Sequence, residues 1–177
     1  MNLRHLLPIP ILSLAFFSVG CNGTTDPEGE LQIMTRKVAA KFTDVPQLST
    51  TDLAAWLADP ERKPPQILDA REPAEFNVSH LPGAIRIDPG ASADDASANI
   101  DPTRPVVIYC SVGYRSSALA NRLIKAGHTN IMNLEGSIFK WANEGRPLVQ
   151  NGQPTHQVHP YNRYYGQMLQ PNHRHKP

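Results

Sequence analysis

The stretch "VVIYCSVGYRSSAL" (106–119) holds the residues best suited to chemistry, because a thiol, Cys110, is followed within five positions by Arg115. A free cysteine has a pKa of about 8.5, and a neighbouring cation or a helix N-terminus lowers it to about 3.5–7.5. Arg115 can supply that cation and a bidentate grip on an oxyanion. A buried cysteine at a strand end is common packing, but the glycine, arginine and hydroxyl residues beside this one favour a nucleophile.

The elements on either side of Cys110 would position its thiol. The β-branched run "PVVIY" (105–109) predicts a central parallel strand buried on both faces, and "RSSALANRLIKAG" (115–127) predicts the helix that follows. In the loop between them Gly113 can adopt a positive φ, and successive N–H groups form an anion-binding nest at the positive end of the helix dipole. We therefore expect the substrate to be bound by Ser111, Val112, Gly113, Tyr114 and Ser116.

Predicted strands and helices alternate along the rest of the domain. The expected strands are 66–69, 84–87 and 129–134, and the expected helices are 31–42, 52–59, a short one from 73, and 138–145. This alternation predicts an α/β fold with a mainly parallel sheet of four or five strands flanked by helices. Ligands of open parallel sheets collect at the carboxyl ends of the strands, which is where Cys110 lies.

The N-terminal segment predicts export. Its apolar run, residues 6–19, is shorter than the roughly 20 residues of a membrane-spanning helix and suits the core of a signal peptide, which we assign to residues 1–20. Cys21 stands at the expected cleavage site, so the segment resembles a bacterial lipoprotein signal, which implies lipid on Cys21 and attachment to a membrane. Ser18 departs from that pattern, because leucine is usual there. Ordinary secretion and an uncleaved anchor stay open as alternatives, and all three predict a periplasmic or cell-surface domain.

Composition and segment boundaries limit the remaining possibilities. A chain of 177 residues has room for one domain with appendages, and its net charge of +1 excludes the basic field that nucleic-acid binding requires. We expect a polar tether over 21–30, the domain over 31–148, and a polar tail rich in histidine and proline over 149–177, either disordered or draped over the domain. The tail histidines lack cysteine or carboxylate partners nearby, so we predict no metal site there.

Three motifs in this order give the chain a resemblance to a known family. "LDAREPAEFNVSHLPGAIRI" (68–87), "YCSVGYRS" (109–116) and "LEGSIFKW" (134–141) resemble the signatures of the rhodanese, or sulfurtransferase, domain over about 48–148. The resemblance implies the rhodanese-like α/β fold. One departure concerns the last motif, because Ser137 stands where a second glycine is usual, which leaves open how closely that loop approaches the active site.

The resemblance also implies a chemical mechanism that needs no cofactor. The Cys110 thiolate would attack the outer sulfur of a small sulfur-containing anion such as thiosulfate, release sulfite and become a persulfide. Cyanide or a thiol would then accept the sulfur. Arg115 and Arg71 would orient the anionic donor, and Asp69 would either orient Arg71 or serve as a turn residue.

Two other function classes stay open. One is a persulfide carrier or anion-sensing module that hands its sulfur only to a partner protein. The other is a phosphatase or arsenate reductase, which the loop length disfavours: those enzymes place five residues between cysteine and arginine, whereas four stand between Cys110 and Arg115. The sequence carries no signal for the oligomeric state.

Overall fold

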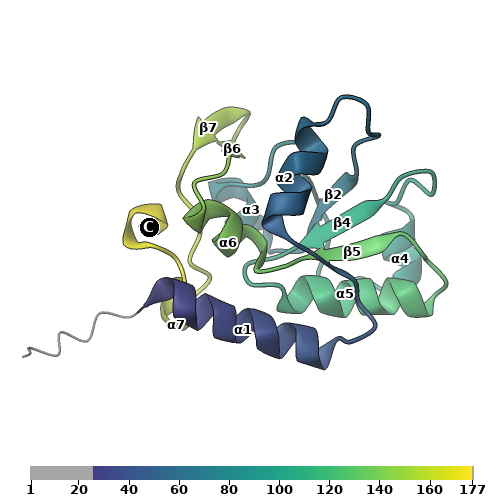
Figure 1. Ribbon diagram of the computed structural model, residues 1–177, viewed down its shortest axis with the longest axis horizontal. Helices are drawn as coiled ribbons and strands as arrows, with labels where there is room; N and C mark the ends of the chain where they lie inside the picture. The colour runs from purple at the N-terminus through teal and green to yellow at the C-terminus, as the bar shows by residue number, and fades with distance from the viewer. Residues whose placement is uncertain (1–25, 177) are drawn as a thin grey trace, which may run out of the picture.

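A five-stranded parallel sheet is the centre of the computed structural model, which describes residues 26–176 (Figure 1). The strand order is β1-β5-β4-β2-β3, and every neighbouring pair runs parallel. The strands are β1 Gln47–Leu48, β2 Gln66–Asp69, β3 Ile85–Arg86, β4 Val106–Tyr109 and β5 Ile131–Leu134. The predicted α/β fold is confirmed, with β4 fully buried at the middle of the sheet. The predicted signal peptide and Cys21 lie outside the described residues.

Helices cover both faces of the sheet. They are α1 Pro27–Lys41, α2 Thr50–Ala58, α3 Pro73–Val78, α4 Ala93–Ser97, α5 Tyr114–Lys125 and α6 Ser137–Asn143. Side chains of β4 alternate between two buried clusters, because successive residues of a strand point to opposite faces. Val107 and Tyr109 join the cluster that contains α2 and α6, and Val106 and Ile108 join the one that contains α4 and α5 (Figure 1).

The first helix begins earlier than the sequence pattern predicts. We expected a tether up to residue 30, but α1 starts at Pro27. Asp26 caps it by accepting a hydrogen bond from the Glu28 N–H at 3.2 Å, and proline is favoured at the first helical position. Over residues 26–176 no helix combines the length and the apolar character that crossing a membrane would require.

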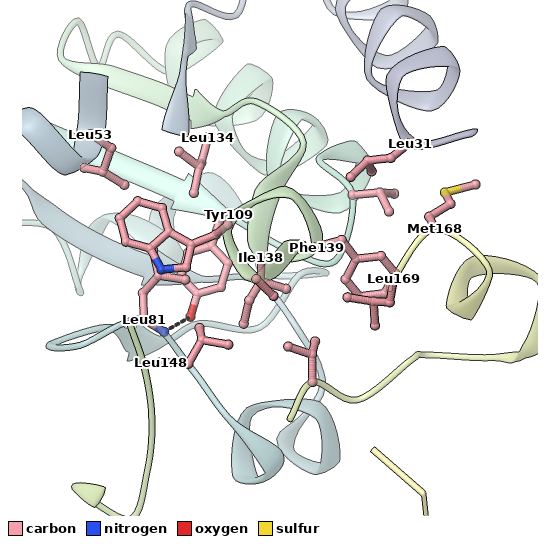
Figure 2. Close-up of a cluster of buried hydrophobic side chains, with 14 of the residues drawn as sticks. Leu31, Leu53, Leu81, Tyr109, Leu134, Ile138, Phe139, Leu148, Met168 and Leu169 are labelled. Carbon is pink, nitrogen blue, oxygen red and sulfur yellow. Dashed lines mark hydrogen bonds between the residues drawn. The ribbon is translucent and has the colours of Figure 1, made fainter. Parts of the chain in front are cut away.

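The polar tail is folded and packed against the domain. Strand β6 (Leu148–Gln150) pairs antiparallel with β7 (Gln153–Thr155), and α7 (Arg163–Gly166) and the 3-10 helix η1 (Pro171–His173) follow. The sequence left open whether this tail is disordered or draped over the domain, and in the structure it is draped over the domain. Figure 2 shows Met168 and Leu169 in the same buried cluster as Phe139 of α6. The apolar residues of this segment follow no helical or strand period, so no periodic signal marks them in the sequence.

Candidate active site

Cys110 lies at the carboxyl end of β4, in a loop whose backbone is aimed at its sulfur. The thiol is only 1% exposed, and the Gly113 N–H donates a hydrogen bond to Sγ at 3.2 Å. Gly113 has φ of 106° and stands at the N-cap of α5. A Cβ there would approach Asn133 Nδ2 to 3.4 Å in a left-handed backbone conformation, so the loop requires glycine at this position.

The environment of Cys110 favours its thiolate. Burial by itself raises the pKa of the thiol, because it disfavours the charged form. The positive charge of Arg115, the side chain and backbone N–H of Ser116, and the Gly113 N–H lower that pKa by more, so that it falls below its ordinary value. The thiolate is the nucleophilic form of cysteine, and this loop increases its share at neutral pH.

The hydroxyl proton of Ser116 has a second acceptor, the side chain of Asn133. Ser116 Oγ donates to Asn133 Oδ1 at 2.6 Å. The orientation of that amide is fixed, because Asn133 Nδ2 donates to Gln47 Oε1 at 2.7 Å and to the Leu134 carbonyl at 3.1 Å. A hydroxyl has one proton to donate. The backbone N–H groups of the loop are therefore the permanent donors to the sulfur, and Ser116 adds its proton only when it releases Asn133.

Glu75 is a site residue that the sequence reasoning missed. Its carboxylate is 2% exposed and accepts hydrogen bonds from Arg115 Nη1 at 2.7 Å, Arg115 Nη2 at 2.8 Å and Ser111 Oγ at 2.7 Å. Burial raises the pKa of this carboxyl, but the contacts with Arg115 and Ser111 outweigh it and hold the pKa below its usual range. The position was visible in "REPAEF", but there Glu75 predicted only a favourable first turn of α3.

This ion pair ties Arg115 to α3. Both of its Nη atoms donate to Glu75, and Nη2 also donates to Ser111 Oγ at 2.9 Å. These contacts use three of the five N–H groups of the guanidinium, so the predicted grip on a substrate oxyanion stays a prediction.

Asp69 and Arg71 form a buried network behind the site. Both side chains are 0% exposed and are joined by an ion pair of 2.6 Å. Tyr109 donates its hydroxyl proton to Asp69 at 2.6 Å, and Arg71 also donates to the Ser79 carbonyl at 2.6 Å. Asp69 thus orients Arg71, and neither residue stands in the wall of the cavity that contains Cys110.

Ser137, the departure from the family pattern, contacts the active loop directly. The Cys110 N–H donates to Ser137 Oγ at 3.1 Å, and the Ile138 N–H donates to the Cys110 carbonyl at 3.2 Å. Ser137 adopts φ of 54°, the left-handed region that glycine occupies more easily. The loop before α6 therefore approaches the active site closely despite the missing glycine.

A cavity of about 150 Å³ opens onto the thiol. Its lining residues are Cys110, Ser111, Val112, Tyr114, Arg115, Tyr161 and Tyr165. Tyr114 is held by α1 and its C-cap, because Lys41 Nζ donates to its hydroxyl and the Phe42 ring packs edge-on at 5.4 Å. A larger hollow of about 210 Å³ between α1 and α6 contains no cysteine, so we assign the site to the smaller cavity. Over residues 26–176 no group of three or more His, Cys, Asp or Glu side chains is arranged to hold a metal ion.

Comparisons with known proteins agree with this fold and indicate a family. The family model described as "Rhodanese-like domain" matches residues 49–144. A sulfurtransferase of Allochromatium vinosum is 33% identical over 105 residues, which cover 59% of this chain and 95% of that protein. The thiosulfate sulfurtransferase GlpE of Pseudomonas aeruginosa is 34% identical over 43% of this chain and 68% of its own length. The crystal structure of a rhodanese-related protein from Thermoplasma volcanium superposes with a TM-score of 0.51 at 26% identity, covering 59% of this chain and 97% of that one.

Proposed function

Because the chain belongs to the rhodanese-like domain family, whose members include proteins named sulfurtransferases, we propose that it transfers sulfane sulfur through a persulfide on Cys110. One observation carries this proposal. The thiol of Cys110 has a lowered pKa, accepts a backbone N–H from its own loop, and lies in the wall of a small cavity. That combination suits a nucleophile that must hold a charged sulfur atom between two reactions.

The first step loads the cysteine. The Cys110 thiolate attacks the outer sulfur of a thiosulfate-type donor, a new S–S bond forms, and the original S–S bond breaks. Sulfite leaves with the electron pair. The charge of Arg115 and the N–H groups of the loop favour binding of the anionic donor and the negative charge that stays on the terminal sulfur of the persulfide.

The second step unloads it. A nucleophilic acceptor, cyanide or a thiolate, attacks the terminal sulfur and forms a bond to it. The S–S bond to Cys110 breaks, and its electron pair returns to Sγ as the thiolate. Lowering the pKa of Cys110 assists this step as well, because a thiol of low pKa is a better leaving group.

Intact-mass spectrometry tests the proposal. The protein without residues 1–20 should gain one sulfur atom after thiosulfate and lose it after cyanide, and thiocyanate should accumulate over many cycles. Cys110→Ser is the control and should show no gain. A wild-type protein that gains no sulfur would contradict the persulfide, and a gain that small acceptors never remove would favour the carrier function instead.

We also propose that the domain is exported and attached to a membrane by lipid on Cys21. The support is the sequence of residues 1–21, which combines a signal-like apolar run with a cysteine at the expected cleavage site. Full-length protein expressed in a bacterium should sediment with membranes, and Cys21→Ser should move it to the soluble fraction. An unchanged membrane fraction in Cys21→Ser would indicate an uncleaved anchor.

A further inference from the structure

We propose that the C-terminal segment, residues 156–175, belongs to the active site and restricts it to small sulfur compounds, because Tyr161 and Tyr165 wall the cavity over Cys110. The proposal rests on the proposed function and names its substrate class: compact sulfur anions and low-molecular-weight thiols, as opposed to a cysteine on the surface of a folded protein. The family match ends at residue 144, so this wall is supplied by a part of the chain that lies beyond the match.

The two tyrosines line the cavity together with residues of the active loop. Tyr161 lies over the Arg115 guanidinium, with 4.8 Å between its ring centroid and Cζ. Such a cation–π contact is worth about 0.5–2 kcal/mol, depending on how far it is removed from water. Tyr165 packs edge-on against Tyr161 with 5.5 Å between the ring centroids. The wall is therefore joined to the same arginine that lowers the pKa of Cys110.

Tyr161 is held in its position at a conformational cost. Its φ of 63° is in the left-handed region, which costs a non-glycine residue on the order of 1–3 kcal/mol and persists only where the surroundings enforce it. Two hydrogen bonds enforce it here: the Asn162 N–H donates to the Pro160 carbonyl at 2.8 Å, and the Tyr161 N–H donates to His159 Nδ1 at 3.0 Å. Burial lowers the pKa of His159, which favours the neutral ring that can accept this hydrogen bond.

The rest of the segment is attached to the domain as firmly as a core element. Val158, Met168 and Leu169 are buried, and each such side chain stabilises the packed state by about 1.5–3 kcal/mol. Asn143, at the end of α6, holds the backbone of the segment through two hydrogen bonds, both of 2.9 Å. Its Nδ2 donates to the Met168 carbonyl, and its Oδ1 accepts from the Gln170 N–H. The backbone that carries the two tyrosines is thus held against the domain.

The size and charge of the cavity select the substrate class. The cavity has a volume of about 150 Å³, which suits a small molecule or anion. That space admits thiosulfate, cyanide or a small thiol, whereas a protein cysteine would bring its own backbone and neighbours against Tyr161 and Tyr165. The N–H groups of the loop and the Arg115 guanidinium, whose charge Glu75 partly neutralises, favour small anions in this cavity.

Alkylation of Cys110 by reagents of different size tests the wall without requiring sulfur transfer. Iodoacetamide and a fluorescein maleimide are compared, with modification of Cys110 followed by peptide mass spectrometry and each rate divided by the rate for glutathione. The double variant Tyr161→Ala/Tyr165→Ala should react at least about tenfold faster with the maleimide, a change of about 1.4 kcal/mol in barrier, with little change for iodoacetamide. Tyr164→Ala is the matched control, because Tyr164 precedes Tyr165 in α7 but does not line the cavity.

Equal size selectivity in the wild type and the double variant would overturn the proposal. The variant Tyr161→Trp controls for loosening of the segment in the double variant, because it enlarges the ring instead of removing it. It should slow the alkylation of Cys110 even by iodoacetamide. An unchanged alkylation rate in Tyr161→Trp would also contradict the proposal. The persulfide assay is read in parallel. Size selection by the tyrosines without a persulfide would refute only the sulfur chemistry, whereas a persulfide with no size selection would refute only the wall.

Discussion

Replacing Glu75 with glutamine is expected to slow sulfur transfer by about 10²-fold while lowering the pKa of Cys110. The rate should fall because Glu75 fixes both Arg115 and Ser111, and a displacement of about 1 Å at a reacting group can cost that factor. The pKa should fall because Glu75 neutralises much of the charge of Arg115, and an unpaired guanidinium stabilises the thiolate more strongly. The pKa is measured from the pH dependence of Cys110 alkylation, and the rate from single-turnover transfer to cyanide.

The opposite response of Arg115→Ala makes this prediction specific. Loss of the guanidinium should also slow transfer, but it should raise the pKa of Cys110, because the charge of Arg115 is the strongest influence that lowers it. Glu61→Gln is the control: it removes an exposed carboxylate that does not line the cavity and should change neither quantity. A purely structural role for Glu75 would leave the pKa of Cys110 unchanged or move it in the same direction as Arg115→Ala.

The sequence predicts the conformation of the Cys110 loop well because its signals are local. The β-branched run of β4 and the apolar stripe of α5 fall on consecutive residues, and Gly113 marks the positive φ between them. The Cys110–Arg115 spacing is likewise read from one short stretch. The parallel direction of the strands follows from the alternation of strands and helices, since parallel neighbours require such crossovers, whereas their order comes from the structure.

The partners of that loop could not be read from the sequence, because they come from distant segments. Glu75 is 40 residues from Arg115, and its importance follows from a contact that no spacing rule connects. Tyr161 and Tyr165 stand in a polar stretch whose composition suggested disorder or loose draping. A few buried side chains, Met168 and Leu169 among them, are enough to fix that stretch, and isolated apolar residues give no periodic signal.

The buried pair behind the loop leads to the largest expected loss of stability, in Asp69→Asn. The substitution keeps the size of the side chain but leaves the Arg71 cation buried without its counter-charge, which costs about 3–5 kcal/mol. Nη1 of Arg71 already lacks a hydrogen-bond partner among residues 26–176, so Asp69 supplies most of the compensation for burying this charge. In urea, with an m value of about 2 kcal/mol/M, the unfolding midpoint should fall by roughly 2 M.

Two further variants separate the charge from the packing. Asp69→Asn/Arg71→Met removes the buried cation that Asp69→Asn leaves without a counter-charge. It should recover part of the stability that Asp69→Asn loses, since apolar side chains often replace a buried ion pair without net loss. Tyr109→Phe removes the hydroxyl that accepts from the Leu81 N–H at 3.1 Å (Figure 2) and should cost only about 1–3 kcal/mol. A loss below about 1 kcal/mol in Asp69→Asn would contradict a charged pair. Tyr109 directly precedes Cys110, so the same network also holds the strand end from which Cys110 projects.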